Sequence, residues 1–136
     1  MSLVNQLILH EGICYKPYQD TEGHWTVGVG RNLETTSFTD EEVKLMLASD
    51  IRRAIEAAET LPWFNQLSTI RQRVIIDMIF NLGLEGFKSF YRTIGYIEHK
   101  RYDKAAVEML NSLWADQVGV RAIRLSSMMK TDENYS

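Results

Sequence analysis

The sequence lacks the features that build disulfide scaffolds, disordered chains and membrane proteins. Cys14 is the only cysteine, so an internal disulfide cannot form and a reducing compartment is indicated. We expect this thiol to be semi-buried, with a reactive nucleophile as the alternative. Two prolines and eight glycines in 136 residues argue against disorder. No apolar run is long enough to span a bilayer, and residues 1–12 lack a signal-peptide pattern, so we expect no membrane insertion and no export signal.

Basic charge is also scarce where a nucleic-acid binder would need it. Residues 1–60 carry five basic and ten acidic side chains, and residues 61–136 carry ten basic and eight acidic ones, for a formal net charge of −3. A nucleic-acid partner would require a concentrated basic patch, so none is expected. The three histidines, His10, His24 and His99, share no metal-ligand spacing. We therefore expect neither a metal nor another cofactor.

The chain begins with a pattern typical of a short amphipathic helix over residues 3–11. Leu3, Leu7 and Glu11 recur at the spacing of one helical face, and Gly12 is well placed to end the helix. Glu11 therefore lies at the end of an apolar stripe, which is an unusual place for a carboxylate. Desolvation there would favour the neutral, proton-donating form of the side chain.

Residues 14–30 change to a strand-like pattern that is interrupted by a polar loop, which predicts a β-hairpin. A three-residue loop over 22–24 would place Asp20 directly opposite Thr26, with their Cβ atoms roughly 5 Å apart. A loop of another length would break this pairing. Gly28 and Gly30 indicate either close backbone approach by a ligand or a simple strand bend.

The remainder of the chain has helical periodicity. Thr39 and Glu42 form a capping-box signature, and the helix that they begin should close near Leu61-Pro62. A central helix that is apolar on most sides should end at Gly83. Further helices are expected near residues 87–99, 103–114 and 118–130. The pattern predicts an α+β, mainly α protein forming one domain over 1–136, with a small β-lobe at about 12–35 and a helical lobe from 1–11 and 39–130.

Glu11 and Asp20 are a pair of carboxylates in different surroundings. Splitting a glycosidic bond requires one carboxyl group that is protonated and one that is ionised. Glu11 suits the first role, and Asp20 beside a polar loop suits the second, with the Thr26 hydroxyl placed to hold a water. The alternative is that these residues are ordinary helix-end and turn positions, and Glu22 is more typical of a plain turn residue.

The segment "LILHEGICYKPYQDTEGHWTVGVGRNL" resembles the phage-type lysozyme family, glycoside hydrolase family 24. The shared features are Glu11-Gly12 at a helix end, the Tyr18-x-Asp20-x-x-Gly23 hairpin, and the run Thr26-Val27-Gly28-Val29-Gly30. "RQRVIIDMIFNLGLEGFKSF" and "YDKAAVEMLNSLWA" resemble the family's central helix and a later helix. The resemblance covers nearly the whole chain and implies a two-lobe lysozyme-like fold.

The resemblance also implies an activity and a set of roles. The activity is hydrolysis of the β-1,4 bond between N-acetylmuramic acid and N-acetylglucosamine in bacterial peptidoglycan, by a monomer that binds the glycan strand. Glu11 is then the general acid, and Asp20 with Thr26 positions water for inversion. The same resemblance gives supporting roles to Gly28 and Gly30, makes Arg121 the partner of the catalytic glutamate, and suggests saccharide contacts for the following residues: Glu22, Asn32, Phe80, Thr93 and Glu108.

Some residues depart from the family pattern, and several biological settings stay open. Arg31 replaces the usual histidine, Asn32 an apolar residue, and Glu108 an expected asparagine. These changes affect subsite preference. We expect an endolysin for host lysis that is made in the host cytoplasm and acts on the cell wall after release. The alternatives are a virion-associated or injected muramidase, or a non-catalytic peptidoglycan-binding domain of the same fold.

Overall fold

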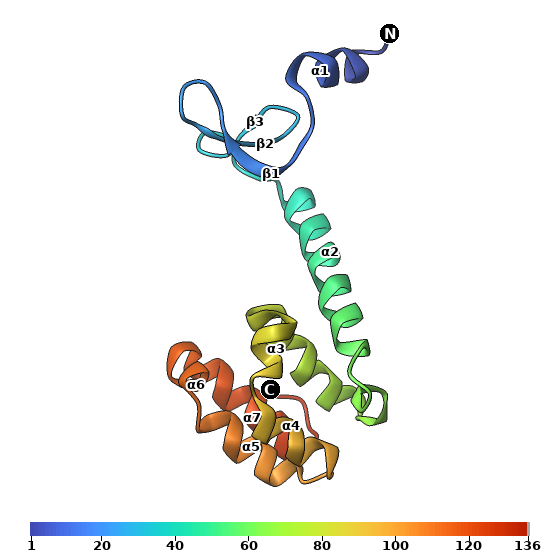
Figure 1. Cartoon of the computed structure of the whole chain (residues 1–136), viewed down its shortest axis with the longest axis vertical. Helices are drawn as coiled ribbons and strands as arrows, with labels where there is room; N and C mark the ends of the chain where they lie inside the picture. Colours follow the sequence, from blue (N-terminus) through green and yellow to red (C-terminus); the bar gives the residue numbers. More distant parts are fainter. Residues whose placement is uncertain (136) are drawn as a thin grey trace. The chain divides into compact units, whose positions relative to one another are not determined.

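The structure is a computed structural model that describes residues 1–135. It is α+β and mainly α, as the sequence predicts, with seven α-helices and one small antiparallel sheet in the described part of the chain (Figure 1). The chain divides into two compact units, Met1–Leu45 and the residues from Met46 onward. None of the helices over 1–135 is both long and apolar enough to cross a bilayer. The assignment of lobes within a single domain stays a prediction.

The first unit contains a short helix and a three-stranded sheet. Helix α1 (Leu3–Glu11) has the expected bounds, and the N–H of Gly12 closes it by donating to the carbonyl of Ile8. Strands β1 (Cys14–Gln19), β2 (Trp25–Gly28) and β3 (Arg31–Asn32) follow in the order β1-β2-β3. A hairpin is present as predicted. Strand β3 was not predicted, because a run of two residues is too short to show a strand pattern.

The register of the hairpin differs from the prediction. Thr26 lies opposite Tyr18 and not opposite Asp20, and Gln19 lies opposite Trp25. The reason is that the turn begins earlier, because the N–H of Gly23 donates to the carbonyl of Asp20 at 3.0 Å. The N–H of Asp20 then donates to the carbonyl of His24 at 2.9 Å, which places these two residues across from each other. The shift is two residues, so Asp20 and Thr26 keep the same face of the sheet.

One other expectation about this unit is wrong. Cys14 is exposed and is not the semi-buried thiol that a small apolar residue in a strand suggests. Its place at the start of the irregular part of β1 explains this, because the pairing with β2 is interrupted between Cys14 and Tyr18. Pro17 lies in that interruption, where a missing backbone N–H costs no ladder hydrogen bond.

The second unit is helical. Helix α2 (Asp40–Glu59) starts in the first unit, and its capping box is formed as predicted by reciprocal bonds between Thr39 and Glu42. The others are the 3-10 helix η1 (Phe64–Gln66), α3 (Thr69–Lys88), α4 (Tyr91–Glu98), α5 (Tyr102–Leu110), α6 (Leu113–Val118) and α7 (Val120–Thr131).

Four helix boundaries in this unit differ from the prediction. Gly83 does break the helical geometry of α3, with φ +76° and ψ 164°, but helical turns resume and continue to Lys88. The helix expected over 103–114 is two helices, because the Ser112 hydroxyl accepts the N–H of Ala115 and starts α6. The helices expected from 87 and 118 begin a few residues later, at Tyr91 and Val120.

The core of the second unit is built around α3. Val74, Ile75 and Met78 are completely buried, which agrees with a central helix that is apolar on most sides. An aromatic series joins this helix to its neighbours through ring contacts of 5.8–6.5 Å. Its members are Trp63, Phe87, Phe90 and Trp114. The indole N–H of Trp114 donates to Asn81 Oδ1 at 2.8 Å, so its one polar atom is satisfied.

Arg31 has a structural role in the first unit. Its guanidinium pairs with the carboxylate of Glu42 and lies 5.3 Å from the centre of the Phe38 ring, which ties β3 to the first turn of α2. This guanidinium, followed by the backbone N–H of Thr39, lowers the pKa of Glu42 from 4.5 to about 2. The pair therefore contributes stability above pH 4.5 that is lost as the pH falls towards 2.

The pH dependence of this pair can be tested by replacing Glu42 with Gln. The melting temperature of Glu42→Gln should be below that of the wild type at pH 6, and the gap should close between pH 4.5 and 2 as Glu42 is protonated in the wild type. Glu41→Gln is the matched control, because Glu41 pairs with no cation among residues 1–135. The role of the pair is refuted if both variants follow the same pH dependence.

Candidate functional site

Glu11 lies at the end of α1, where its carboxylate meets the turn between β2 and β3. A Cβ built on Gly30 would lie 2.6 Å from Glu11 Oε2, so only a residue without a side chain allows this approach. Gly30 also has φ +65°, which favours glycine independently. The group that approaches Gly30 is therefore a side chain of the same unit, and the approach of a ligand to this glycine stays a prediction.

The dry surroundings expected for Glu11 are not found within the first unit. Its side chain is exposed, and no residue of α1 is buried. The reason is that the apolar stripe of this nine-residue helix, which includes Leu3 and Leu7, is itself exposed. The first unit by itself therefore positions Glu11 but does not desolvate it.

Asp20 is held at the start of the hairpin turn. Its Oδ1 accepts the backbone N–H of His24 at 2.8 Å and that of Glu22 at 2.9 Å. These bonds, the one from His24 first, lower the pKa of Asp20 below its ordinary value of 3.8. Hydrogen bonds to the charged form stabilise the anion, so this carboxyl group is ionised near neutral pH, which is the state its predicted role requires.

Thr26 is the buried polar residue of β2, with 4% of its surface exposed. Its hydroxyl donates to the carbonyl of His24 at 3.0 Å. The donor capacity of Thr26 is thereby used, while its oxygen can still accept a hydrogen bond. No hydrogen bond joins Thr26 directly to Asp20 within the described residues, but both side chains bond to the backbone of His24.

Two predicted saccharide contacts lie in the same unit and have partners of their own. Glu22 Oε2 lies 3.6 Å from His24 Nε2, and its side chain is 80% exposed. Asn32 Oδ1 accepts the N–H groups of Glu34 and Thr35 at 2.8 and 3.2 Å, so it holds the turn after β3. Gly28 has φ +69°, which fits a strand bend, and the space beside it is open, so the approach of a ligand there stays a prediction.

Two further predicted contacts share one groove in the second unit. Thr93 and Glu108 both line an open groove of about 460 Å³, whose walls also include Phe90, Arg92 and Trp114. Glu108 is half-buried, whereas Thr93 is only 2% exposed and offers little surface to a ligand. The groove combines aromatic and apolar residues with a similar number of polar ones, which suits a ligand that has both apolar faces and hydrogen-bonding groups.

Phe80 and Arg121 line a different groove of the second unit, of about 640 Å³. Phe80 is 44% exposed. Arg121 donates from Nε to Asp77 Oδ1 at 2.8 Å, and its Nη2 lies 2.7 Å from the same oxygen. Asp77 is thus a partner of Arg121 that sequence reasoning missed. The pairing of Arg121 with Glu11 stays a prediction, because Glu11 belongs to the first unit.

The effect of Gly30 on Glu11 can be tested by comparing Gly30→Ala with Gly28→Ala. Both positions have a similar positive φ, so both variants should lose about 1–2 kcal/mol of stability from backbone strain alone. Only Gly30→Ala should displace the Glu11 carboxyl group, which a change in its carboxyl-carbon chemical shift would report. Equal shifts of that carbon in both variants would contradict the contact.

Comparison with known proteins identifies relatives of this chain. The family model described as phage lysozyme matches residues 9–131. "Probable T4-type lysozyme 1" and "Probable T4-type lysozyme 2" of Dictyostelium discoideum are 28% and 25% identical to this chain, and each alignment covers 96% of the chain and 94% of the relative. "Pre-baseplate central spike protein Gp5" of Enterobacteria phage T4 is 25% identical over 96% of the chain, which matches 28% of that protein.

The family match extends from the end of α1 through α7 and therefore includes Glu11, Asp20 and Thr26. It covers far more than half of the 136 residues. The chain therefore belongs to the phage lysozyme family, and it is a lysozyme-type glycoside hydrolase in sequence and fold.

Proposed function

We propose that this protein hydrolyses the β-1,4 bond between N-acetylmuramic acid and N-acetylglucosamine in peptidoglycan. The observation that carries the proposal is the arrangement of the first unit, which holds two carboxylates by different means. Glu11 lies against Gly30 at a helix end, and Asp20 is bonded by two backbone N–H groups in a hairpin turn. The backbone bonds to Asp20 favour its anion. Glu11 is then the carboxyl group left to donate the proton, and glycoside hydrolysis needs such a pair.

Glu11 is the general acid in this proposal. Its carboxyl proton passes to the glycosidic oxygen as the bond to the anomeric carbon breaks and an oxocarbenium-like centre develops. Glu11 is thereby left as the carboxylate. The family's Glu-Gly motif and the match over residues 9–131 support this role.

Asp20 and Thr26 position the attacking water. Asp20 Oδ1 is occupied by two N–H groups, whereas Oδ2 accepts no hydrogen bond within residues 1–135. The Thr26 hydroxyl donates a hydrogen bond to the carbonyl of His24 and keeps a free acceptor site on its oxygen. A water that donates one hydrogen bond to Asp20 and one to Thr26 turns its lone pair towards the anomeric carbon. Asp20 then takes the proton that the water loses.

The water attacks from the face opposite the leaving group, so the product has the inverted configuration. This outcome requires room for a water between the two carboxyl groups, which corresponds to a separation of roughly 6.5–9.5 Å in the substrate complex. The groove with Thr93 and Glu108 is the proposed place for saccharide contacts in the second unit. No metal or other cofactor enters this mechanism.

The biological role that we propose is host-cell lysis by an endolysin. A second setting, a muramidase carried by the virion, is favoured by one observation. A protein that matches 96% of this chain is named as a pre-baseplate central spike protein. A non-catalytic glycan-binding domain of the same fold is the alternative from another class. It is disfavoured because all three motif residues are present.

Replacing Glu11 with Gln tests the catalytic role. Glu11→Gln cannot donate the proton, so clearing of Gram-negative cells with a permeabilised outer membrane should slow by about 10²- to 10⁴-fold. Glu41→Gln, on the exposed first turn of α2, removes the same charge and should clear cells like the wild type. Equal clearing by wild type and Glu11→Gln would remove Glu11 from the mechanism. No clearing by the wild type would favour the binding domain.

The configuration of the first product tests the proposed path of the water. NMR of a freshly hydrolysed oligosaccharide should show the α-anomer before mutarotation, because water attacks from the face opposite the leaving group. A β-anomer as the first product would mean retention and would exclude the proposed role of Asp20 and Thr26.

A further inference from the structure

His24 connects both water-positioning residues through its backbone. Its N–H donates to Asp20 Oδ1 at 2.8 Å, and its carbonyl accepts the Thr26 hydroxyl at 3.0 Å. The same carbonyl accepts the N–H of Asp20 at 2.9 Å. A movement of the backbone at His24 would therefore disturb the Asp20 carboxylate and the Thr26 hydroxyl together.

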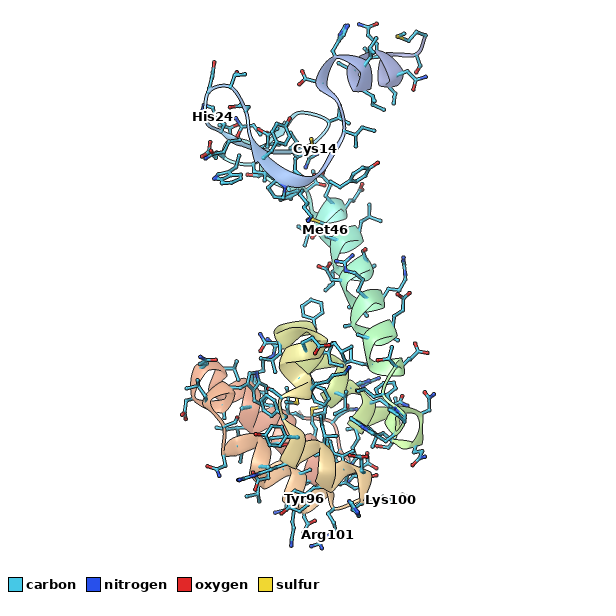
Figure 2. All side chains as sticks on the ribbon, viewed as in Figure 1. Cys14, His24, Met46, Tyr96, Lys100 and Arg101 are labelled. Atoms are coloured by element: carbon cyan, nitrogen blue, oxygen red, sulfur yellow. The ribbon has the colours of Figure 1, made fainter. Side chains whose placement is uncertain are left out.

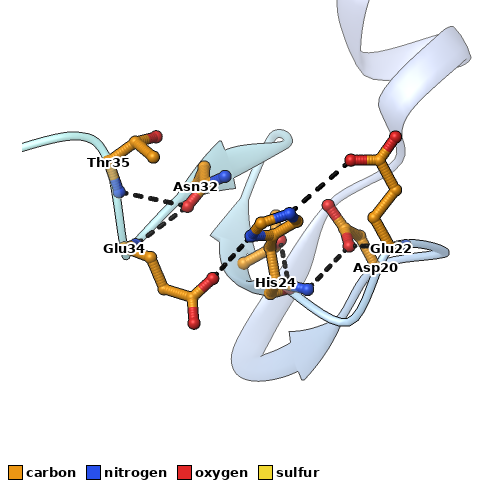
Figure 3. Close-up of polar contacts among 7 residues, drawn as sticks. Asp20, Glu22, His24, Asn32, Glu34 and Thr35 are labelled. Carbon is orange, nitrogen blue, oxygen red and sulfur yellow. Dashed lines mark hydrogen bonds and ion pairs between the residues drawn. The ribbon is translucent and has the colours of Figure 1, made fainter.

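The side chain of His24 is anchored to a different part of the sheet. Its Nδ1 lies 2.7 Å from Glu34 Oε2, in the loop after β3 (Figure 3). Glu34 is itself held, because its N–H donates to Asn32 Oδ1, and Asn32 pairs with Thr26 in the sheet. The contacts therefore form a closed path from β3 through Glu34 and His24 to the hairpin turn.

The charges around His24 favour this anchoring. The carboxylates that face it are Asp20 and Glu22 from the hairpin and Glu34 from the loop after β3. Glu34 is the dominant partner, because Glu22 is 3.6 Å away and 80% exposed. A bond from Nδ1–H to Glu34 is available to the imidazolium and to one neutral tautomer. Figure 2 shows His24 among the side chains of the β1–β2 hairpin.

We propose that the contact between Glu34 and His24 is a clamp that positions Asp20 and Thr26 for the water-activating step. His24 and Glu34 are positioning residues in this proposal, since their side chains act through the backbone at His24. The described residues contain no His, Cys, Asp or Glu group that could hold a metal ion, so these acids are not arranged as a metal site. The role in catalysis rests on the proposed function, whereas the effect on Asp20 does not.

The titration of Asp20 distinguishes the clamp from a simple charge effect. Removing the negative charge of Glu34 would, through space alone, lower the pKa of Asp20, because like charges raise the pKa of a carboxyl group. Loss of the clamp has the opposite effect. It frees the turn and weakens the N–H bonds that lower the pKa of Asp20, so the pKa rises. The sign of the change therefore identifies the cause.

The experiment uses the full chain and compares Glu34→Ala with Glu22→Ala as the matched control. The titration midpoint of the Asp20 carboxyl carbon, followed by NMR, should rise in Glu34→Ala and should stay or fall in Glu22→Ala. With a peptidoglycan fragment, kcat of Glu34→Ala should fall about tenfold with KM within about twofold, and the acid limb of the kcat profile should move to higher pH. Glu34→Gln, which keeps an acceptor oxygen, should recover most of kcat.

Specific outcomes would overturn the clamp. An Asp20 midpoint that is unchanged or lower in Glu34→Ala would do so, and so would an equal rise in Glu22→Ala. If the alanine variant does not fold, Glu34→Leu, which keeps the side-chain bulk, tests the clamp by the same titration of the Asp20 carboxyl carbon. An inactive wild type would refute the proposed function alone, because the NMR titration still tests the clamp.

Discussion

The register of the β1–β2 hairpin is the constraint on which the candidate site depends. The bond between the Asp20 N–H and the His24 carbonyl sets which residues face each other. A slip of one residue would turn the Thr26 side chain to the opposite face of the sheet. The observed register instead leaves Thr26 and Asp20 on one face, with the His24 peptide between them. The short strand β3 pairs with the other edge of β2, so the loop that carries Glu34 takes its position from the same register.

Features with local causes were predictable from the sequence. The end of α1 at Gly12, the capping box of Thr39 and Glu42, and the break at Gly83 each follow from a few neighbouring residues. The predicted register of the hairpin was wrong, although the sequence contains a signal for the observed turn. Asp20 followed three residues later by Gly23 is typical of a turn that begins at the aspartate, because aspartate accepts nearby N–H groups and glycine tolerates a positive φ.

The contacts that were not predicted join residues that are distant in the sequence or that belong to no common sequence motif. Asp77 and Arg121 are 44 positions apart, and an acid within an apolar helix does not reveal its partner. His24 and Glu34 come together only because β3 folds back onto β2. Ser112 was missed for another reason: the helical periodicity of residues 103–114 continues through it, whereas its backbone is extended and its hydroxyl accepts the N–H of Ala115, which separates α5 from α6. The N-cap serine therefore overrides the helical periodicity at this position.

The exposed thiol of Cys14 gives this chain a natural attachment point. It is the only cysteine of the sequence, and it lies on β1 opposite Gly28, in the unit that carries Glu11, Asp20 and Thr26 (Figure 2). A maleimide dye or nitroxide would therefore label one position without any substitution. Because the thiol is exposed and ladder hydrogen bonds join backbone groups, the label would not displace a ladder hydrogen bond. The spectroscopic signal would then come from the sheet that supports the proposed chemistry.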